Sequence, residues 1–218
     1  MAKNDPLKAS ILAVKIIPNV SPDLIESFKL KPGQKSLGLV TADCDDVTYT
    51  ALDEATKKAD VEVVYARSFY AGAANANTKL AGEILGIIAG PNPAEVRSGL
   101  NVITQFVNEE AWFVSANEDN TIPYYAHCIS RTGSYLSKIA GVKEGDAIAY
   151  LIAAPLEAMY SLDAALKAAD VKLAAFYGPP SETNFGGGLL TGSQSACKAA
   201  CDAFAEAVKF IADNPTAY

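Results

Sequence analysis

The stretch LDEATKKADV, residues 52–61, returns later in the same chain as LDAALKAADV, residues 162–171. Seven of the ten positions are identical, and the two copies lie 110 residues apart. Solenoid repeats have periods of roughly 20–50 residues, so a spacing of 110 residues is too long for such an array. The repeat instead indicates two tandem domains that arose by duplication.

The similarity continues on both sides of this stretch. Upstream, residues 28–42 match residues 139–154, with a lysine and a glycine kept at an offset of 112. Downstream, IIAGPNPAEV at 87–96 matches LLTGSQSACK at 189–198, at an offset of 102. Because the matches keep the same order along the chain, we place the first domain at residues 1–113 and the second at 114–218.

Each copy predicts the same order of elements: strand, short helix, strand, helix, strand, strand and helix. Short apolar runs predict the strands, and three capping signals predict helix starts: Ser21-Pro22, the capping box Asn92-Pro93-x-Glu95, and Ser193. The predicted strands are 10–17, 36–42, 61–68 and 83–90 in copy one, and 124–130, 147–154, 171–178 and 188–192 in copy two; the repeated helices are 47–59 and 156–169. This order indicates an α+β fold, in which each domain is a mainly antiparallel sheet with helices on one face.

Charge and hydropathy exclude several kinds of partner. The 218 residues carry a formal net charge of −7, so the chain lacks the basic surface that nucleic-acid backbones require. No apolar run is long enough to span a membrane, and the start MAKNDPLKAS contains no signal-peptide core. We therefore expect a soluble, cytoplasmic protein with neither nucleic acid nor membrane as a partner.

Residues that commonly carry catalysis or metals form no recognisable site in the sequence. Cys197 and Cys201 lie among alanines, where we expect them to act as small apolar side chains and not as metal ligands. The single histidine, His127, lies in an apolar strand and is interpreted as structural. No GxSxG, P-loop or GxGxxG motif is present. The sequence predicts a protein that is not an enzyme.

A family resemblance covers nearly the whole chain. The strings DAALKAADVKL (163–173) and SACKAACDAFAEAVK (195–209) resemble the bacterial microcompartment (BMC) shell domain. The strand and short helix that precede the match are typical of circularly permuted shell domains. The motifs SLGLVTADCDDVTY, GPNPAE, SRTGSYLSK and PPSETNF are similar to those of the tandem-domain shell proteins of ethanolamine utilisation.

This resemblance implies a fold of two circularly permuted, ferredoxin-like BMC domains. It also implies that three chains form a homotrimeric, pseudo-hexameric tile, which joins other microcompartment shell proteins around ethanolamine-degrading enzymes. The alternative that the residues leave open is a soluble trimeric regulator that binds a small molecule. Sheet formation by the purified protein would distinguish the two.

One lysine in each copy matches the lysine at the edge of the family's tiles. The resemblance implies that Lys57 and Lys167 contact neighbouring tiles. The residues alone also allow a simpler role, in which each lysine pairs with the aspartate four residues earlier and contributes only about 0.2–0.5 kcal/mol.

The loops that follow the third strand of each copy are predicted to carry function, because long loops on a rigid scaffold commonly form sites. They are residues 68–82 and 178–188, and both are rich in small residues. The resemblance implies that these loops surround the three-fold axis and gate a central pore. We expect the glycine triplet 186–188 to allow loop movement, and the pore-loop candidates are Phe69, Tyr70, Phe185 and Gly186.

Acidic residues occur in copy one where copy two lacks them. Asp43, Asp45 and Asp46 precede the repeated helix, and Glu83 begins the fourth strand, where copy two has glycine. Some of these aspartates could simply cap the helix. The resemblance implies a pocket for ethanolamine, in which carboxylates bind the ammonium group and an indole adds cation–π attraction. The residues we assign to it are Asp45, Glu83, Trp112 and Thr183. No cofactor is predicted to be required; cobalamin is a possible transported or bound ligand, although no D-x-H-x-x-G signature is present.

Overall fold

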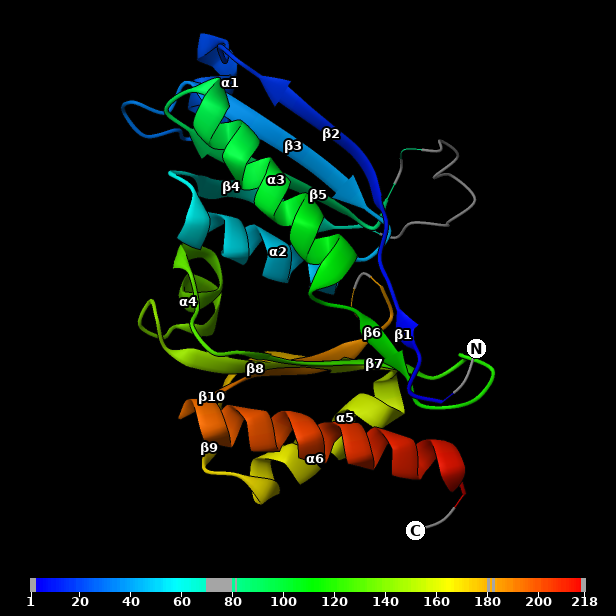
Figure 1. Ribbon diagram of the computed structural model, residues 1–218. Helices are drawn as coiled ribbons and strands as arrows, with labels where there is room; N and C mark the ends of the chain where they lie inside the picture. The colour runs from blue at the N-terminus through cyan, green and yellow to red at the C-terminus, as the bar shows by residue number, and fades with distance from the viewer. Residues whose placement is uncertain (1–2, 70–79, 81, 180, 182, 217–218) are drawn as a thin grey trace. The chain divides into compact units, whose positions relative to one another are not determined.

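A computed structural model describes residues 3–69, 80, 82–179, 181 and 183–216 of the chain. The backbone forms two compact units (Figure 1). Unit 1 consists of Met1–Lys8, Trp112–Thr132 and Ser137–Tyr218, and unit 2 consists of Ala9–Ala111 and Gly133–Leu136. The main division lies between Ala111 and Trp112, while the domain boundaries drawn from the sequence, 1–113 and 114–218, stay a prediction.

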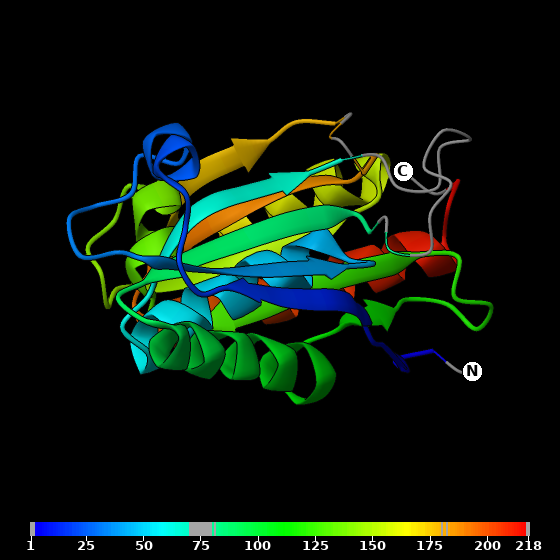
Figure 2. The ribbon, with the colours of Figure 1, turned by 90° about the horizontal axis from the view of Figure 1, so that it is seen from above.

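Unit 2 is a four-stranded antiparallel sheet in the order β2-β3-β5-β4 (Figure 2). Two glycines on one face let two helices approach it closely. A Cβ at Gly38 would lie 2.7 Å from a methyl group of Val96, and one at Gly86 would lie 2.9 Å from a methyl group of Leu52. The elements are β2 Ile11–Ile17, α1 Pro22–Ser27, β3 Ser36–Ala42, α2 Asp45–Lys58, β4 Glu62–Ser68, β5 Ile84–Gly90 and α3 Pro93–Glu109.

The opposite face of this sheet carries a smaller apolar cluster. Leu37 and Ile87 are among its buried residues, and Ile25 of the short helix α1 packs against it. No residue of α1 itself is buried. In unit 2 the long helices therefore cover one face, and α1 covers part of the other.

Unit 1 is a six-stranded antiparallel sheet in the order β1-β6-β7-β8-β10-β9. Its core includes Leu151, Leu190 and Phe204, which lie where the helices α5 and α6 pack against the strands. The elements are β1 Pro6–Leu7, β6 Phe113–Ser115, β7 Pro123–Ile129, β8 Ala147–Ala153, α5 Pro155–Ala168, β9 Val171–Tyr177, β10 Gly186–Gly192 and α6 Gln194–Asp213. The helix α4, Ser134–Ala140, begins in the short segment that belongs to unit 2.

Backbone angles show that the two copies of the sequence repeat share one structure. Lys29 and Gly141 both adopt positive φ, at +54° and +64°, and Gly33 and Gly145 follow with φ of +97° and +95°. These pairs keep the offset of 112 residues found in the sequence. The predicted α+β class with antiparallel sheets is confirmed.

Two of the three predicted helix caps form as expected and one does not. The Asn92 carboxamide oxygen accepts from the backbone N–H groups at the start of α3, and Ser193 caps α6. The Ser21 side chain makes no capping hydrogen bond, so the prediction for α1 is wrong in this detail. The capping box is also wrong at Glu95, because its carboxylate accepts from the N–H of Asp60 at 3.0 Å.

The glycine triplet 186–188 was expected in a mobile loop, and that expectation is wrong. The triplet begins β10, where it is buried between neighbouring strands. Gly187 has φ of +147°, and a Cβ there would lie 1.9 Å from the Leu151 carbonyl oxygen. The glycines therefore allow close strand packing. In the part of the chain that the structure describes, no helix is long and apolar enough to cross a membrane.

Candidate functional site

In unit 2, β3 and β4 end beside the start of β5, and this brings the predicted acidic residues together. Ala42 of β3 and Ser68 of β4 both pair with Ile84, the first residue of β5. The ladder continues by one residue, since the Glu83 N–H donates to the Ala42 carbonyl at 2.8 Å. Asp43 and Asp45, which follow β3, therefore lie close to Glu83, and we call Asp43, Asp45 and Glu83 the acidic cluster.

Asp45 is the buried member of the acidic cluster. Its carboxylate accepts from the Ser68 hydroxyl at 2.7 Å and from the Asp46 N–H at 2.9 Å. The Ser68 hydroxyl also lies 2.5 Å from the Tyr49 hydroxyl. Burial raises the pKa of Asp45, while the hydrogen bond from Ser68 lowers it.

Glu83 is half-buried, and its pKa is raised to about 7. Burial is the largest cause, and the negative charges of Asp45 and Asp43 add to it. Asp43 accepts from the Ser10 N–H at 2.6 Å, whereas the Glu83 carboxyl has no hydrogen bond within the described residues. A carboxylate held next to two others favours a cation, because a positive charge relieves the repulsion that raises its pKa.

Trp112 and Thr183, the other two predicted ligand residues, belong to unit 1. The Lys8 ammonium lies over the Trp112 ring, 5.5 Å from its centroid, so the indole already contacts a cation of its own chain. The Thr183 N–H donates to the Ser181 hydroxyl at 3.3 Å. Because these residues and the acidic cluster belong to different units, the four-residue pocket stays a prediction.

The predicted pore-loop residues differ in their surroundings. Phe69 is exposed, and its N–H donates to the Glu83 carbonyl at 2.9 Å. Phe185 packs edge-on against Phe113, with ring centroids 5.9 Å apart. Gly186 is the first residue of β10, and Tyr70 lies outside the described residues. Their role beside a pore stays a prediction.

The two predicted edge lysines are not equivalent within one chain. Lys167 is exposed and pairs with Asp163 at 2.5 Å, as the simpler interpretation of the sequence predicts. Lys57 is largely buried and lies nearer to Glu54 than to Asp53, from which it is 3.8 Å away. Any contact that these lysines make with neighbouring tiles stays a prediction.

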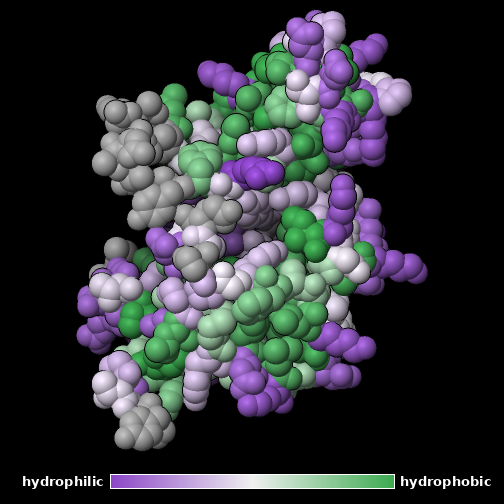
Figure 3. Space-filling model, turned by 180° about the vertical axis from the view of Figure 1, so that it is seen from behind, coloured by the Kyte–Doolittle hydropathy of each residue, from purple (hydrophilic) through white to green (hydrophobic). Residues whose placement is uncertain are grey.

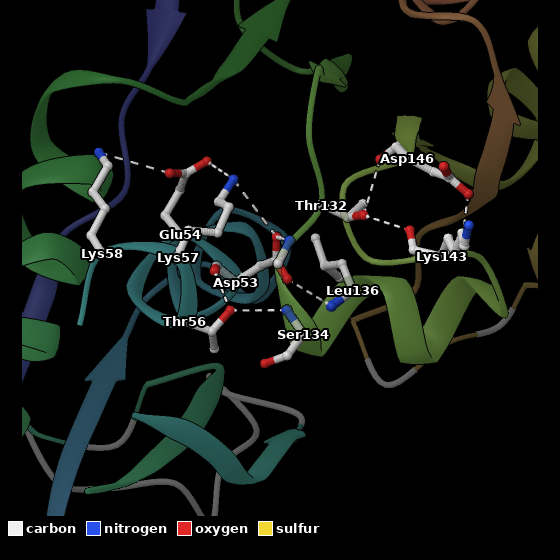
Figure 4. Close-up of polar contacts among 11 residues, drawn as sticks. Asp53, Glu54, Thr56, Lys57, Lys58, Thr132, Ser134, Leu136, Lys143 and Asp146 are labelled. Atoms are coloured by element: carbon white, nitrogen blue, oxygen red, sulfur yellow. Dashed lines mark hydrogen bonds and ion pairs between the residues drawn. The ribbon is translucent and has the colours of Figure 1, made fainter. Parts of the chain in front are cut away.

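Asp53 has a structural role that the sequence did not reveal. Its carboxylate accepts from the Gly133 N–H at 2.7 Å and from the Leu136 N–H at 2.8 Å, while Thr56 accepts from the Ser134 N–H at 3.1 Å (Figure 4). Asp53 therefore caps the start of α4. The one signal in the sequence was Gly133, which directly precedes α4 and has no side chain that could cap this helix. Its presence indicates that the cap comes from another part of the chain.

Cys197 and Cys201 are small buried side chains, as predicted, and His127 lies among aromatic residues of unit 1. Cys197 and Cys201 are buried in the apolar core of unit 1, and burial raises the pKa of both thiols. The His127 ring stacks on Tyr125 with 5.5 Å between centroids. Among the residues that the structure describes, no group of three or more acidic, histidine or cysteine side chains could hold a metal ion.

Comparison with known proteins identifies the family. Residues 36–121 match the BMC domain model. The chain is 68% identical over 216 residues to the bacterial microcompartment shell protein EutL of Clostridium perfringens, covering 99% of this chain and 100% of that protein. The chain belongs to the EutL family of bacterial microcompartment shell proteins. The relatives are named as shell proteins, so the prediction that this chain is not an enzyme agrees with the family.

Solved structures agree with this assignment. The crystal structure of ethanolamine utilization protein EutL from Leptotrichia buccalis is 70% identical, covers 99% of this chain and 100% of that one, and superposes with a TM-score of 0.96. A trimeric bacterial microcompartment shell protein, PduB, shares the fold at 21% identity, with a TM-score of 0.76 and coverage of 94% and 89%. The predicted fold of tandem BMC domains is confirmed, and the chain is a microcompartment shell protein.

Proposed function

We propose that three copies of this chain form a pseudo-hexameric tile in the shell of an ethanolamine-utilisation microcompartment, with a gated central pore that ethanolamine regulates. The relatives named as EutL and as an ethanolamine utilization protein support the pathway, and PduB, described as trimeric, supports three-fold assembly. The duplicated domain supports the same assembly, because three chains supply six similar units.

The acidic cluster is the observation that carries the ligand part of this proposal. A primary ammonium keeps its charge well above pH 8, and Glu83 and Asp45 offer it two carboxylates whose pKa values are raised. An ammonium between them would replace mutual repulsion by attraction. Trp112 and Thr183 remain additional candidates for the same ligand.

The position of the acidic cluster couples it to the first predicted pore loop. Ser68, which donates to Asp45, lies at the beginning of the loop 68–82, and Glu83 follows its end. A ligand held by Asp45 and Glu83 would therefore fix both ends of this loop. This connection supports ethanolamine as a regulator of the pore.

Calorimetric titration with ethanolamine tests the ligand site. We expect Glu83→Gln to weaken binding at least tenfold, while Glu118→Gln, a matched change at an exposed glutamate, leaves it unchanged. With a pKa of about 7, Glu83 is about one-tenth ionised at pH 6 and about nine-tenths ionised at pH 8, so wild-type affinity should rise about tenfold over that range. Equal affinity in wild type and Glu83→Gln would contradict the site.

Electron microscopy of the purified protein tests the tile. We expect extended sheets from the wild type and weakened sheets from Lys167→Ala. The matched variant Lys198→Ala removes an exposed lysine that also pairs within its own helix, and it should behave as wild type. Discrete trimers without sheets at high concentration would favour the alternative of a soluble regulator. Cobalamin as a transported or bound ligand stays a prediction to which no residue is assigned.

A further inference from the structure

The first strand of the chain ends beside the tryptophan that we assign to the ligand pocket. β1 pairs with β6 in antiparallel register, with Leu7 opposite Phe113. Continuing this register by one residue places Lys8 opposite Trp112, and side chains that lie opposite each other in this way are close neighbours on one face. The Lys8 ammonium lies 5.5 Å from the centroid of the Trp112 ring, and both residues belong to unit 1. The strand pairing therefore explains why this lysine lies over the indole.

Backbone hydrogen bonds hold the chain on both sides of Lys8. Before it, the Ser115 N–H donates to the Asp5 carbonyl oxygen at 3.1 Å. After it, the Ser10 N–H donates to the Asp43 carboxylate at 2.6 Å. The ammonium itself is carried on a flexible four-carbon stem. A Lys8 ammonium that leaves the ring therefore stays close to it, because its backbone is fixed.

The charged group over the ring is of the same kind as the charged group of ethanolamine. Both are primary ammonium ions with three N–H donors. An aromatic face attracts either of them through its negative electrostatic potential, so the indole does not distinguish the two by their chemistry. Two positive charges held against the same face would repel each other. A ligand that uses this face of Trp112 must therefore displace the ammonium of Lys8.

We infer that Lys8 is a built-in competitor for the ammonium group of ethanolamine at the Trp112 ring, and that it lowers the affinity of the ligand site. The inference rests on the proposed ethanolamine site and adds a residue that determines how tightly the ligand is held. Because Lys8 is covalently attached beside the ring, it competes at a constant and high effective concentration. It raises the ethanolamine concentration needed to fill the site by the same factor as the dissociation constant.

The exposure of the contact determines the size of the effect. Lys8 is exposed and Trp112 is half-buried. A cation–π contact at an exposed site changes a dissociation constant by about two- to fivefold. This is less than the change expected for Glu83→Gln, which removes a carboxylate from the acidic cluster. Lys8 therefore adjusts the affinity, while the carboxylates supply the larger part of it.

A simpler role for Lys8 is to shield the indole from water. Polar and apolar side chains are interspersed on the face of the molecule seen in Figure 3, and lysine stems commonly cover apolar surface while the ammonium stays in water. In that role the stem of Lys8 would matter and its charge would not. Removal of the charge alone would then leave ethanolamine binding unchanged, so the two roles give different results in a binding experiment.

Ethanolamine titrations of full-length variants separate these roles. Lys8→Met keeps an apolar stem but removes the ammonium, and we expect it to lower the dissociation constant about two- to fivefold. Lys8→Arg keeps a cation over the ring and should bind ethanolamine no more tightly than the wild type does. Lys143→Met removes the same charge from another exposed position of unit 1 and should leave the constant within about 1.5-fold.

Two measurements report the binding in parallel. Calorimetry gives the dissociation constant, and the fluorescence of Trp112, the single tryptophan of the chain, reports on the ring itself. We expect the wild-type emission to change along the same binding curve that calorimetry gives.

The outcomes distinguish the inference from the proposed site. If calorimetry shows binding but Lys8→Met binds no more tightly than the wild type, or no more tightly than Lys143→Met, the competition is overturned and the proposed site stays intact. Binding without any change in Trp112 fluorescence has the same consequence. Absence of ethanolamine binding to both the wild type and Lys8→Met would overturn the inference and the proposed site together.

Discussion

Replacement of Asp53 by alanine should destabilise unit 2 by about 3 kcal/mol. The carboxylate is 1% exposed and accepts from the N–H groups of Gly133 and Leu136 at 2.7 and 2.8 Å. A buried N–H left without an acceptor costs about 1–3 kcal/mol, so two such groups cost about 2–6 kcal/mol. Burial raises the pKa of Asp53, which means that holding its charge inside the protein has a cost that alanine removes. The expected net loss therefore lies in the lower half of that range.

Urea unfolding followed by circular dichroism measures this loss. Asp53→Asn keeps one carbonyl oxygen and should lose about half as much as Asp53→Ala. Asp202→Ala is the matched control, because Asp202 is an exposed aspartate paired with Lys198 four residues earlier in its helix, and such pairs contribute less than about 0.5 kcal/mol. If Asp53→Ala changes the free energy of unfolding by less than 1 kcal/mol, or by no more than Asp202→Ala does, the assignment of Asp53 as the cap of α4 is wrong.

Three further predictions concern the acidic cluster and the glycines. Carboxyl NMR titration should give Glu83 a pKa near 7, and Asp45→Asn should lower it by removing a neighbouring negative charge. The folded-state pKa of Glu83 lies above its ordinary value of 4.5, so ionisation of Glu83 reduces the stability of the protein as pH rises from about 4.5 to 7. In denaturant unfolding, Glu83→Gln should therefore stabilise the ligand-free protein by roughly 1–2 kcal/mol at pH 8. The same variant should leave the stability unchanged at pH 4. In the same assay, Gly187→Ala should lower the free energy of unfolding by more than about 3 kcal/mol, because the added Cβ would overlap a carbonyl oxygen. Gly33→Ala should lower it by only about 1 kcal/mol, since φ at Gly33 is positive but the space around it is open.

The sequence predicted the regular elements well because their signals are local. The strand at residues 36–42 agrees with β3 at both ends, and the other predicted strands agree with the structure to within one or two residues. Each apolar run is bounded by turn residues, and each long helix has one apolar side. The repeat added further support, because each predicted element could be compared with its counterpart in the other copy.

The failures concern contacts that no local pattern encodes. Glu95 fits a capping box by spacing, but the Asp60 N–H lies within reach only after β4 and α3 have packed. The glycine triplet 186–188 has the composition of a loop, yet the strands on either side of β10 approach so closely that side chains there would overlap them. The composition of a segment shows which backbone conformations it could adopt. The packing of the neighbouring strands determines which of them it does adopt.

The candidate site was predicted in part, through the differences between the two copies. Asp45 and Glu83 were found because copy two lacks them, and the structure brings both to the ends of neighbouring strands. The hydrogen bonds of Ser68 and Tyr49 could not be found in this way, because they join β4 to α2 across 23 and 19 residues of sequence. Sequence differences identified the acidic residues, and tertiary structure supplied their environment.

The two aspartates at equivalent positions show how duplication lets one helix serve two purposes. Asp53 is buried within the folded chain, so it can bind backbone N–H groups that never meet water. Asp163 is exposed in the single chain, and its pairing with Lys167 keeps the charge stabilised without a partner chain. The same ten-residue stretch therefore caps the start of a helix in one copy and forms an exposed ion pair in the other.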